Sequence, residues 1–249
     1  MNRRTTLAKT TVYLAAASTI TVGLSACGSS HPAGPGAGRA AAQNPVTTGA
    51  PDPTATGRVL KTLLPAGSDL ASGVTITGAA DSGSDWTAPG DPPSPGLATA
   101  DCAALPQITA DEATIDYRAA YAKETITVKN TPIAQIVLAA TNPGDAAKQI
   151  DEVKALAARC RTFSAPNADE TSVGGTVTAT AVPGLGDEAL DVRVTATGPD
   201  AANYQQPELI LVRVGDKLAV VSDDYAGQDN GSARKAAQVL VARLTGQPA

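Results

Sequence analysis

The chain has 249 residues, a net charge of −5 and a pI near 4.9, and its aromatic residues are only one Trp, one Phe and five Tyr. A core in such a chain must be built from Val, Leu, Ile and Ala. No run of Lys or Arg follows Lys9. The charge balance therefore argues against nucleic acid, or an anionic lipid surface, as the partner of the folded part.

Residues 1–26 have the features of a lipoprotein signal peptide. A basic start is followed by an apolar stretch that ends in Leu24-Ser25-Ala26-Cys27. The stretch is shorter than the roughly 20 apolar residues of a membrane-spanning helix. We therefore expect cleavage before Cys27 and acylation of its thiol, which would anchor the protein to the extracytoplasmic face of the cell membrane. An ordinary secretory signal cut near Ala26 is the alternative, and both the general secretory and the twin-arginine routes remain open.

Residues 27–57 are rich in Gly, Ala, Pro, Ser and Thr and hold almost no large apolar side chain. Such a segment cannot bury enough surface to offset the entropy lost on ordering it, so we predict a disordered tether. The only histidine of the chain, His31, lies in this segment, where a solvated side chain is expected. Residues 58–249 then form the extracytoplasmic domain.

Cys102 and Cys160 are the only cysteines besides Cys27. Two cysteines in an exported chain indicate a disulfide. The bridge would close a loop worth roughly 4 kcal/mol in the chain-entropy model. We interpret it as a structural staple, because the sequence lacks the C-x-x-C spacing that depresses a thiol pKa.

Helical periodicity appears in the segments 143–159 and 233–244. Asn142 is the expected N-cap of the first helix. The capping-box spacing of Thr109 and Glu112 favours a third helix over 109–121. The residues expected on the buried face of the first helix are Ala146, Ile150, Val153, Ala157 and Cys160.

Period-two patterns predict strands, and the tightest hairpin turns at Gly215-Asp216. Consecutive strands without helices between them require an antiparallel sheet. We therefore predict an α+β fold with one disulfide, in which an antiparallel sheet of five or six strands carries two or three helices on one face. The strands expected are 133–140, 176–181, 189–197, 208–214 and 217–222.

The chain carries, in this order, Leu64-Pro65, Cys102, Cys160, Phe163, Gly174, Leu185-Gly186-Asp187-Glu188-Ala189 and Val212-Arg213-Val214-Gly215-Asp216. This order resembles the extracellular sensor domains of actinobacterial lipoproteins, which are similar to the external domain of PknH-type receptor kinases. The resemblance spans roughly residues 60 to 245 and implies an antiparallel sheet, packed helices and a cleft for an envelope ligand.

The sequence contains few residues that could form a catalytic or metal-binding site. Without histidine or a free cysteine in residues 58–249, a Ser-His or Cys-His nucleophile and a His-rich zinc site are excluded. The pairs Asp187-Glu188 and Asp223-Asp224 are expected in solvated turns, because adjacent strand residues point to opposite faces. The segment 223–231 lacks calcium-loop spacing and is expected to cap the last helix through Asn230 or Ser232. We expect no enzyme activity, no metal and no cofactor.

Candidate ligand contacts are few. Tyr117, Tyr121 and Tyr204 could line a pocket or lie half-buried on the surface. Arg213 is either an edge-strand charge or a pocket cation. The leading hypothesis is a ligand-binding or sensor-type envelope domain with an unidentified ligand or protein partner. A lipid or glycolipid carrier and a non-catalytic interaction module are the alternatives.

Overall fold

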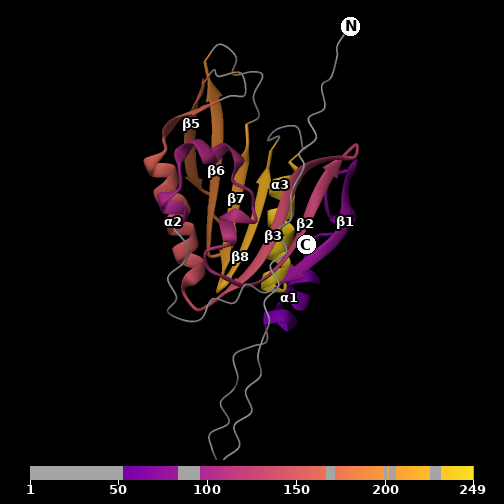
Figure 1. Cartoon of the computed structure of the whole chain (residues 1–249). Coiled ribbons are helices and arrows are strands. Elements are labelled where there is room, and N and C mark those ends of the chain that lie inside the picture. The colour runs from indigo at the N-terminus through magenta and orange to yellow at the C-terminus, as the bar shows by residue number, and fades with distance from the viewer. Residues whose placement is uncertain are drawn as a thin grey trace, which may run out of the picture. The chain divides into compact units, whose positions relative to one another are not determined.

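The computed structural model describes residues 53–83, 96–166, 172–198, 201, 206–224 and 231–248. In these residues one eight-stranded antiparallel sheet has the order β1-β2-β3-β8-β7-β6-β5-β4 (Figure 1). The predicted antiparallel sheet is confirmed, but the predicted number of strands is too low. The strands are β1 Val74–Gly83, β2 Arg118–Val128, β3 Thr131–Thr141, β4 Thr162–Pro166, β5 Ser172–Ala181, β6 Glu188–Thr197, β7 Glu208–Val214 and β8 Lys217–Asp223.

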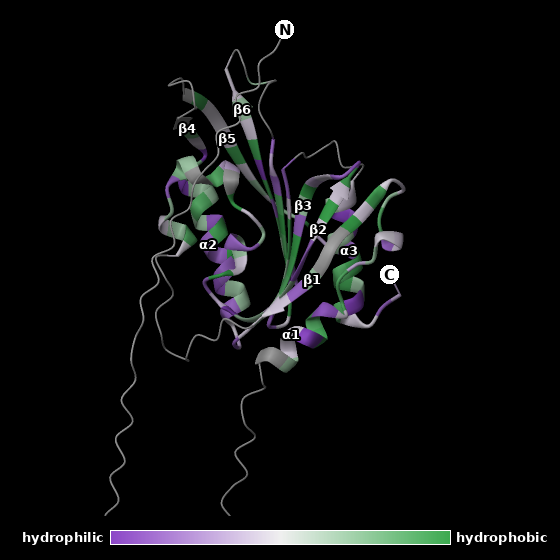
Figure 2. Cartoon of the chain, turned by 45° about the vertical axis from the view of Figure 1, so that its right-hand side comes forward, coloured by the Kyte–Doolittle hydropathy of each residue, from purple (hydrophilic) through white to green (hydrophobic). Residues whose placement is uncertain are grey.

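Helices cover both faces of the sheet, which runs between α2 and α3 in Figure 2. The prediction that all helices lie on one face is therefore wrong. Its physical reason is that the central strands are apolar on both sides: Ile136 and Leu138 join one buried cluster, and Val137 joins the other. Two apolar faces must both be covered. The helices are α1 (Pro53–Lys61) and α3 (Ser232–Thr245) on what we call the α1/α3 face, and α2 (Asp145–Arg159) on the α2 face.

The β7–β8 hairpin forms the centre of the core. Its two strands pair in register from Glu208–Asp223 to Val214–Lys217, as the sequence predicted. Gly215 takes the left-handed conformation that the tight turn requires, with φ of 59°. The run Leu209–Val212 is buried throughout, so alternate residues of this strand feed the two opposite cores.

Helix α2 begins two residues later than predicted. Gly144, with φ of 82°, stands at the N-cap position in place of Asn142. The predicted face is confirmed, since all five of its residues are buried. At α3, Gly231 stands at the N-cap position without a side-chain cap, so the predicted cap by Ser232 does not form. Asn230 lies outside the described residues.

The segment 109–121 is not the predicted helix. The capping box does form, because the Thr109 N–H donates to Glu112 Oε2 (2.9 Å) and the Glu112 N–H donates to Thr109 Oγ1 (3.2 Å). The turn that it starts, η4, covers only Glu112–Thr114. Strand β2 then begins at Arg118 and pairs with β1 and β3.

The first described helix begins inside the segment predicted to be a tether, because α1 starts at Pro53. Gly57 allows its close approach to the sheet: a Cβ there would lie 3.0 Å from the carbonyl oxygen of Gly83. The predicted signal peptide and tether up to residue 52, with Cys27 and His31, lie outside the described residues. None of the helices in the described part has the length and hydropathy of a membrane span.

Candidate functional site

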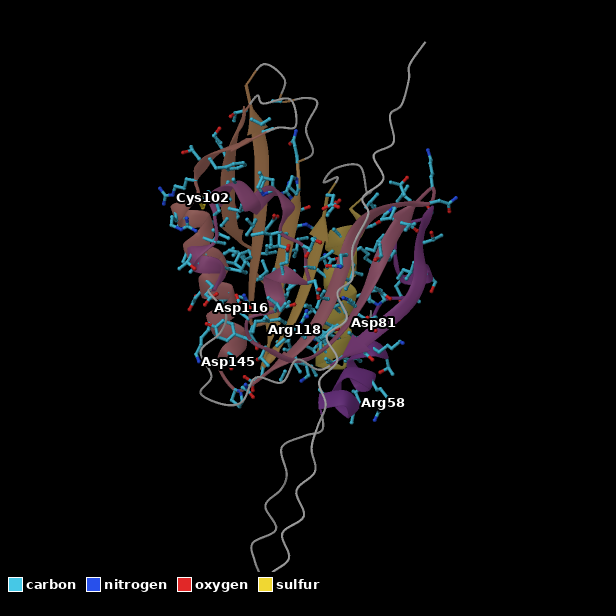
Figure 3. The ribbon with its side chains drawn as sticks, viewed as in Figure 1. Arg58, Asp81, Cys102, Asp116, Arg118 and Asp145 are labelled. Atoms are coloured by element: carbon cyan, nitrogen blue, oxygen red, sulfur yellow. A yellow bond between two sulfur atoms is a disulfide. The ribbon has the colours of Figure 1, made fainter. Side chains whose placement is uncertain are left out.

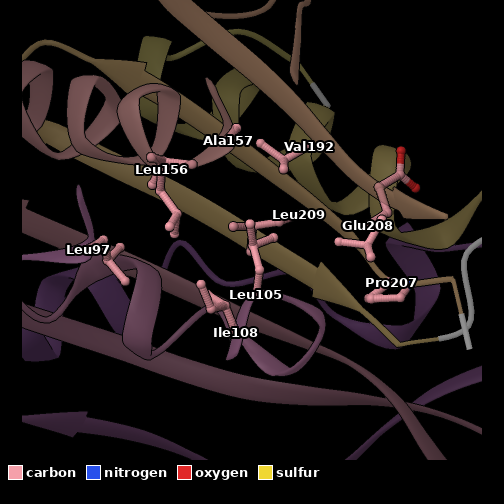
Figure 4. A pocket seen from close by; sticks show the side chains of 11 residues that line it. Leu97, Leu105, Ile108, Leu156, Ala157, Val192, Pro207, Glu208 and Leu209 are labelled. Atoms are coloured by element: carbon pink, nitrogen blue, oxygen red, sulfur yellow. The ribbon is translucent and has the colours of Figure 1, made fainter. Parts of the chain in front are cut away.

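An apolar pocket lies on the α2 face (Figure 4). One wall is the segment 96–117, which we call the strap because it crosses this face before β2 begins. The other walls are α2 and the strands β6 and β7. The cavity has a volume of about 20 Å³, roughly the room of one water molecule, and it opens to solvent. The lining residues are Leu97, Leu105 and Ile108 of the strap, Val153, Leu156 and Ala157 of α2, and Val192, Val194, Pro207, Glu208 and Leu209 of the sheet side.

The predicted disulfide fixes the strap to the end of α2. Cys102 and Cys160 are bonded, with their Cα atoms 5.3 Å apart, and Cys160 is fully buried. Arg159 adds polar contacts to the same strap, since its guanidinium donates to the carbonyl oxygens of Ala98 (3.1 Å) and Ala100. The staple therefore sits beside the pocket wall that it holds in place.

A second set of contacts fixes the strap to the sheet near β2. Arg118, which is almost fully buried, pairs with Asp111. Lys123 reaches the other oxygen of the same carboxylate at 3.5 Å, and the Asp111 N–H donates to Gln135 Oε1 (2.9 Å). The strap is thus anchored on both sides of Leu105 and Ile108; Figure 3 labels Cys102 and Arg118 at these two attachments.

A polar cluster adjoins the pocket where Leu97 enters it. The Leu97 N–H donates to Asp116 Oδ2 (3.2 Å), and the Tyr117 hydroxyl donates to Glu152 Oε1 (2.7 Å). Burial raises the pKa of Asp116, and the neighbouring Glu152 raises it further. Burial and the hydrogen bond to Glu152 raise the pKa of Tyr117 to about 12. At neutral pH the tyrosine is therefore a neutral donor in this cluster.

Among the described residues that line the pocket, Glu208 is the only ionisable one, but its carboxylate points away from the other lining side chains (Figure 4). It pairs with Arg193, which also contacts Asp191 at 3.2 Å. Arg234 of α3 reaches Asp191 at 2.9 Å. Burial raises the pKa of Glu208, with a further contribution from Asp191, whereas Arg193 lowers it. This network ties the pocket's strands to α3.

Two of the tyrosines singled out in the sequence, Tyr117 and Tyr121, do not line the pocket. Tyr117 belongs to the polar cluster. Tyr121 is half-buried, with the guanidinium of Arg118 4.1 Å and the ammonium of Lys123 5.4 Å from its ring centre. Tyr204 lies outside the described residues.

Arg213 is neither an edge-strand charge nor a pocket cation. It lies on β7, between β6 and β8, and contacts Asp187 (3.6 Å) and Glu188 (3.5 Å). These two carboxylates therefore meet at one arginine. The predicted solvated position is confirmed for Asp224, which is exposed, and is wrong for Asp223, which is buried at the end of β8.

Within the described part of the chain, no three His, Cys, Asp or Glu side chains are grouped to hold a metal ion. Asp229 and Asn230, in the segment 223–231 that was considered as a calcium loop, lie outside that part. Sequence reasoning missed the pocket because its strap residues have no repeating period. The signal available was the apolar set Leu97, Leu105 and Ile108 in a segment otherwise rich in small residues.

No family model and no curated protein sequence matches this chain. Among solved structures, the chain is similar to the extracellular domain of PknH from Mycobacterium tuberculosis, with 13% sequence identity and a TM-score of 0.50. The match covers 77% of this chain and 97% of that domain. At this identity the likeness is one of fold. The described part of the chain therefore has the fold of an extracellular domain, and the sequence-level resemblance to PknH-type domains is supported to that extent.

Proposed function

We propose that this chain is a lipoprotein anchored to the extracytoplasmic face of the cell membrane through Cys27, and that its folded part is a ligand-binding or sensor-type domain. The proposed activity is binding rather than catalysis. The signal-like leader supports the location. The Cys102–Cys160 bridge supports it independently, because disulfides persist in oxidising compartments.

The observation that carries the binding role is the apolar pocket beneath the strap. Ten of the eleven described residues that line it are apolar, and none of these eleven is aromatic. Such an aliphatic lining favours a ligand that inserts a small aliphatic group. The strap supplies a wall held at both sides, so the site is pre-organised and a ligand need not order it.

Anchoring is tested by Cys27→Ser in the full chain. Because acylation requires the thiol, the variant should leave the membrane fraction or accumulate with its leader uncleaved. Normal cleavage and unchanged membrane partition of the variant would contradict the proposed anchor.

Binding is tested by thermal shift with short-chain fatty acids and cell-wall fragments as probes. A probe at a hundredfold excess over its Kd stabilises the protein by about 2.7 kcal/mol. For a domain of this size that raises the Tm by about 5 to 10 °C. Ala157→Phe fills the pocket and should abolish the shift. Its matched control is Ala158→Phe on the exposed side of α2, which should retain it.

A shift that survives Ala157→Phe would place binding elsewhere. If no probe shifts the wild-type Tm, the proposal of a ligand with a small aliphatic group fails. A non-catalytic interaction module would then be the function that remains consistent with the fold and the leader.

A further inference from the structure

Glu124 is a carboxylic acid inside an apolar core. It lies on β2 between Ala122 and Ile126, and both of these belong to the buried cluster of the α1/α3 face. Since alternate strand residues share a face, Glu124 points to the same side. It is 8% exposed, and its Oε1 atom has no hydrogen-bond partner. An unpaired buried carboxylate is costly, so the neutral acid is the form that fits this position.

The segment packed over this face is the start of the described chain. Leu60 and Leu64, at and just beyond the end of α1, are buried in the same cluster as the neighbours of Glu124. Gly57 brings the helix close to the backbone of β1 and β2. The docking of residues 53–70 therefore rests largely on apolar contacts to the surface that Glu124 interrupts.

Two charged groups act on Glu124. Arg243 of α3 pairs with Asp69 (2.7 Å) and donates to the carbonyl oxygens of Leu63 (3.4 Å) and Leu64. Burial raises the pKa of Glu124 to about 7, Arg243 lowers it and Asp69 raises it. Arg243 is already engaged by the segment after α1, so it does not act as a dedicated counter-ion.

The other described elements around Glu124 add no compensating charge. The basic residues of α1, Arg58 and Lys61, are exposed. The stretch of β1 across from Glu124, Gly78-Ala79-Ala80, has no titratable group, and Asp81 beyond it is exposed. The register partner of Glu124 on β3 is the apolar residue Ile136.

We propose that Glu124 makes the docking of residues 53–70 on the sheet sensitive to pH: the segment is held firmly while Glu124 is protonated, and its docking weakens when Glu124 ionises. Helix α2 packs on the opposite face of the sheet and does not face this carboxyl group, so it retains its packing. The device is a local one, in which a terminal helix opens while the rest of the domain stays folded.

Hydrogen exchange on the full chain at pH 5.5 and pH 8.5, expressed as protection factors corrected for intrinsic exchange, tests the proposal. An acid with pKa near 7 when docked and 4.5 when exposed predicts an about 30-fold loss of protection for residues 53–70 between these two conditions. The β7–β8 hairpin serves as the internal reference and should lose far less.

Glu124→Gln removes the titrating group and should make protection of residues 53–70 independent of pH. Glu124→Leu gives the same test if the glutamine variant folds poorly. The matched control is Glu112→Gln, an exposed carboxylate on the other face, which should keep the wild-type pH dependence. An equal loss of protection across the whole domain would overturn the proposal. It would also be overturned if both Glu124 variants kept the pH dependence of the wild-type protein.

Discussion

Reduction of the Cys102–Cys160 bridge is expected to destabilise the folded domain by about 4 kcal/mol. The bridge joins residues separated by 58 positions. For a loop of that length the chain-entropy model gives an entropy change of about −14 cal/mol/K, which is about 4 kcal/mol at 25 °C. Chemical reduction leaves every side chain in place, so it isolates the loss of the cross-link from a change in packing.

Calorimetry of the oxidised and reduced wild-type protein measures this effect. A loss of about 4 kcal/mol corresponds to a fall in Tm of about 8 to 16 °C for a domain of this size. The variant Cys102→Ala/Cys160→Ala is the control, and reductant should not change its Tm. A fall of less than about 2 °C in the wild type would refute the loop-closure reasoning.

Three further changes test the core and the polar cluster. Gly175→Ala places a Cβ 2.3 Å from Phe163 Cζ, so a loss of about 1 to 3 kcal/mol is expected in denaturant unfolding, with recovery when Phe163→Ala is added. Leu218→Ala, at a fully buried position, should cost about 2 to 5 kcal/mol in the same assay. In ultraviolet titration, Tyr117 should ionise near pH 12, and Glu152→Gln should lower its pKa, whereas no change would contradict the hydrogen bond between them.

The elements with a clear period were predictable from sequence. Helix α2 begins within two residues of its predicted start because its apolar residues recur at helical spacing. The β7–β8 hairpin appears as predicted because two apolar runs flank the turn residues Gly215-Asp216. The presence of helices on both faces of the sheet could also have been predicted from the sequence. The uninterrupted apolar run Leu209–Val212 is typical of a strand buried on both faces, and such a strand needs cover on both sides.

Strands β1 and β2, in the N-terminal part of the sheet, were not predicted because of their composition. Strand β2 carries Lys123 and Glu124 within an apolar alternation, and a working capping box precedes it, so local signals favoured a helix. Tertiary pairing with β1 and β3 decides its conformation instead. The pocket was unpredictable for a related reason: its strap and α2 residues meet only because the bridge and Arg159 bring the strap across the sheet.

The bridge and the strap both belong to the α2 face, and within the described residues no disulfide ties α1 to the sheet. A mechanical load applied at the N-terminus reaches α1 before it reaches any strand. Because α1 is held by side-chain packing and by close backbone approach at Gly57, such a load would peel this helix away first. The α2 face, which is closed by the disulfide, would come under load only after α1 has detached. In a protein tethered by its N-terminus, tension would therefore be absorbed on the face opposite the pocket.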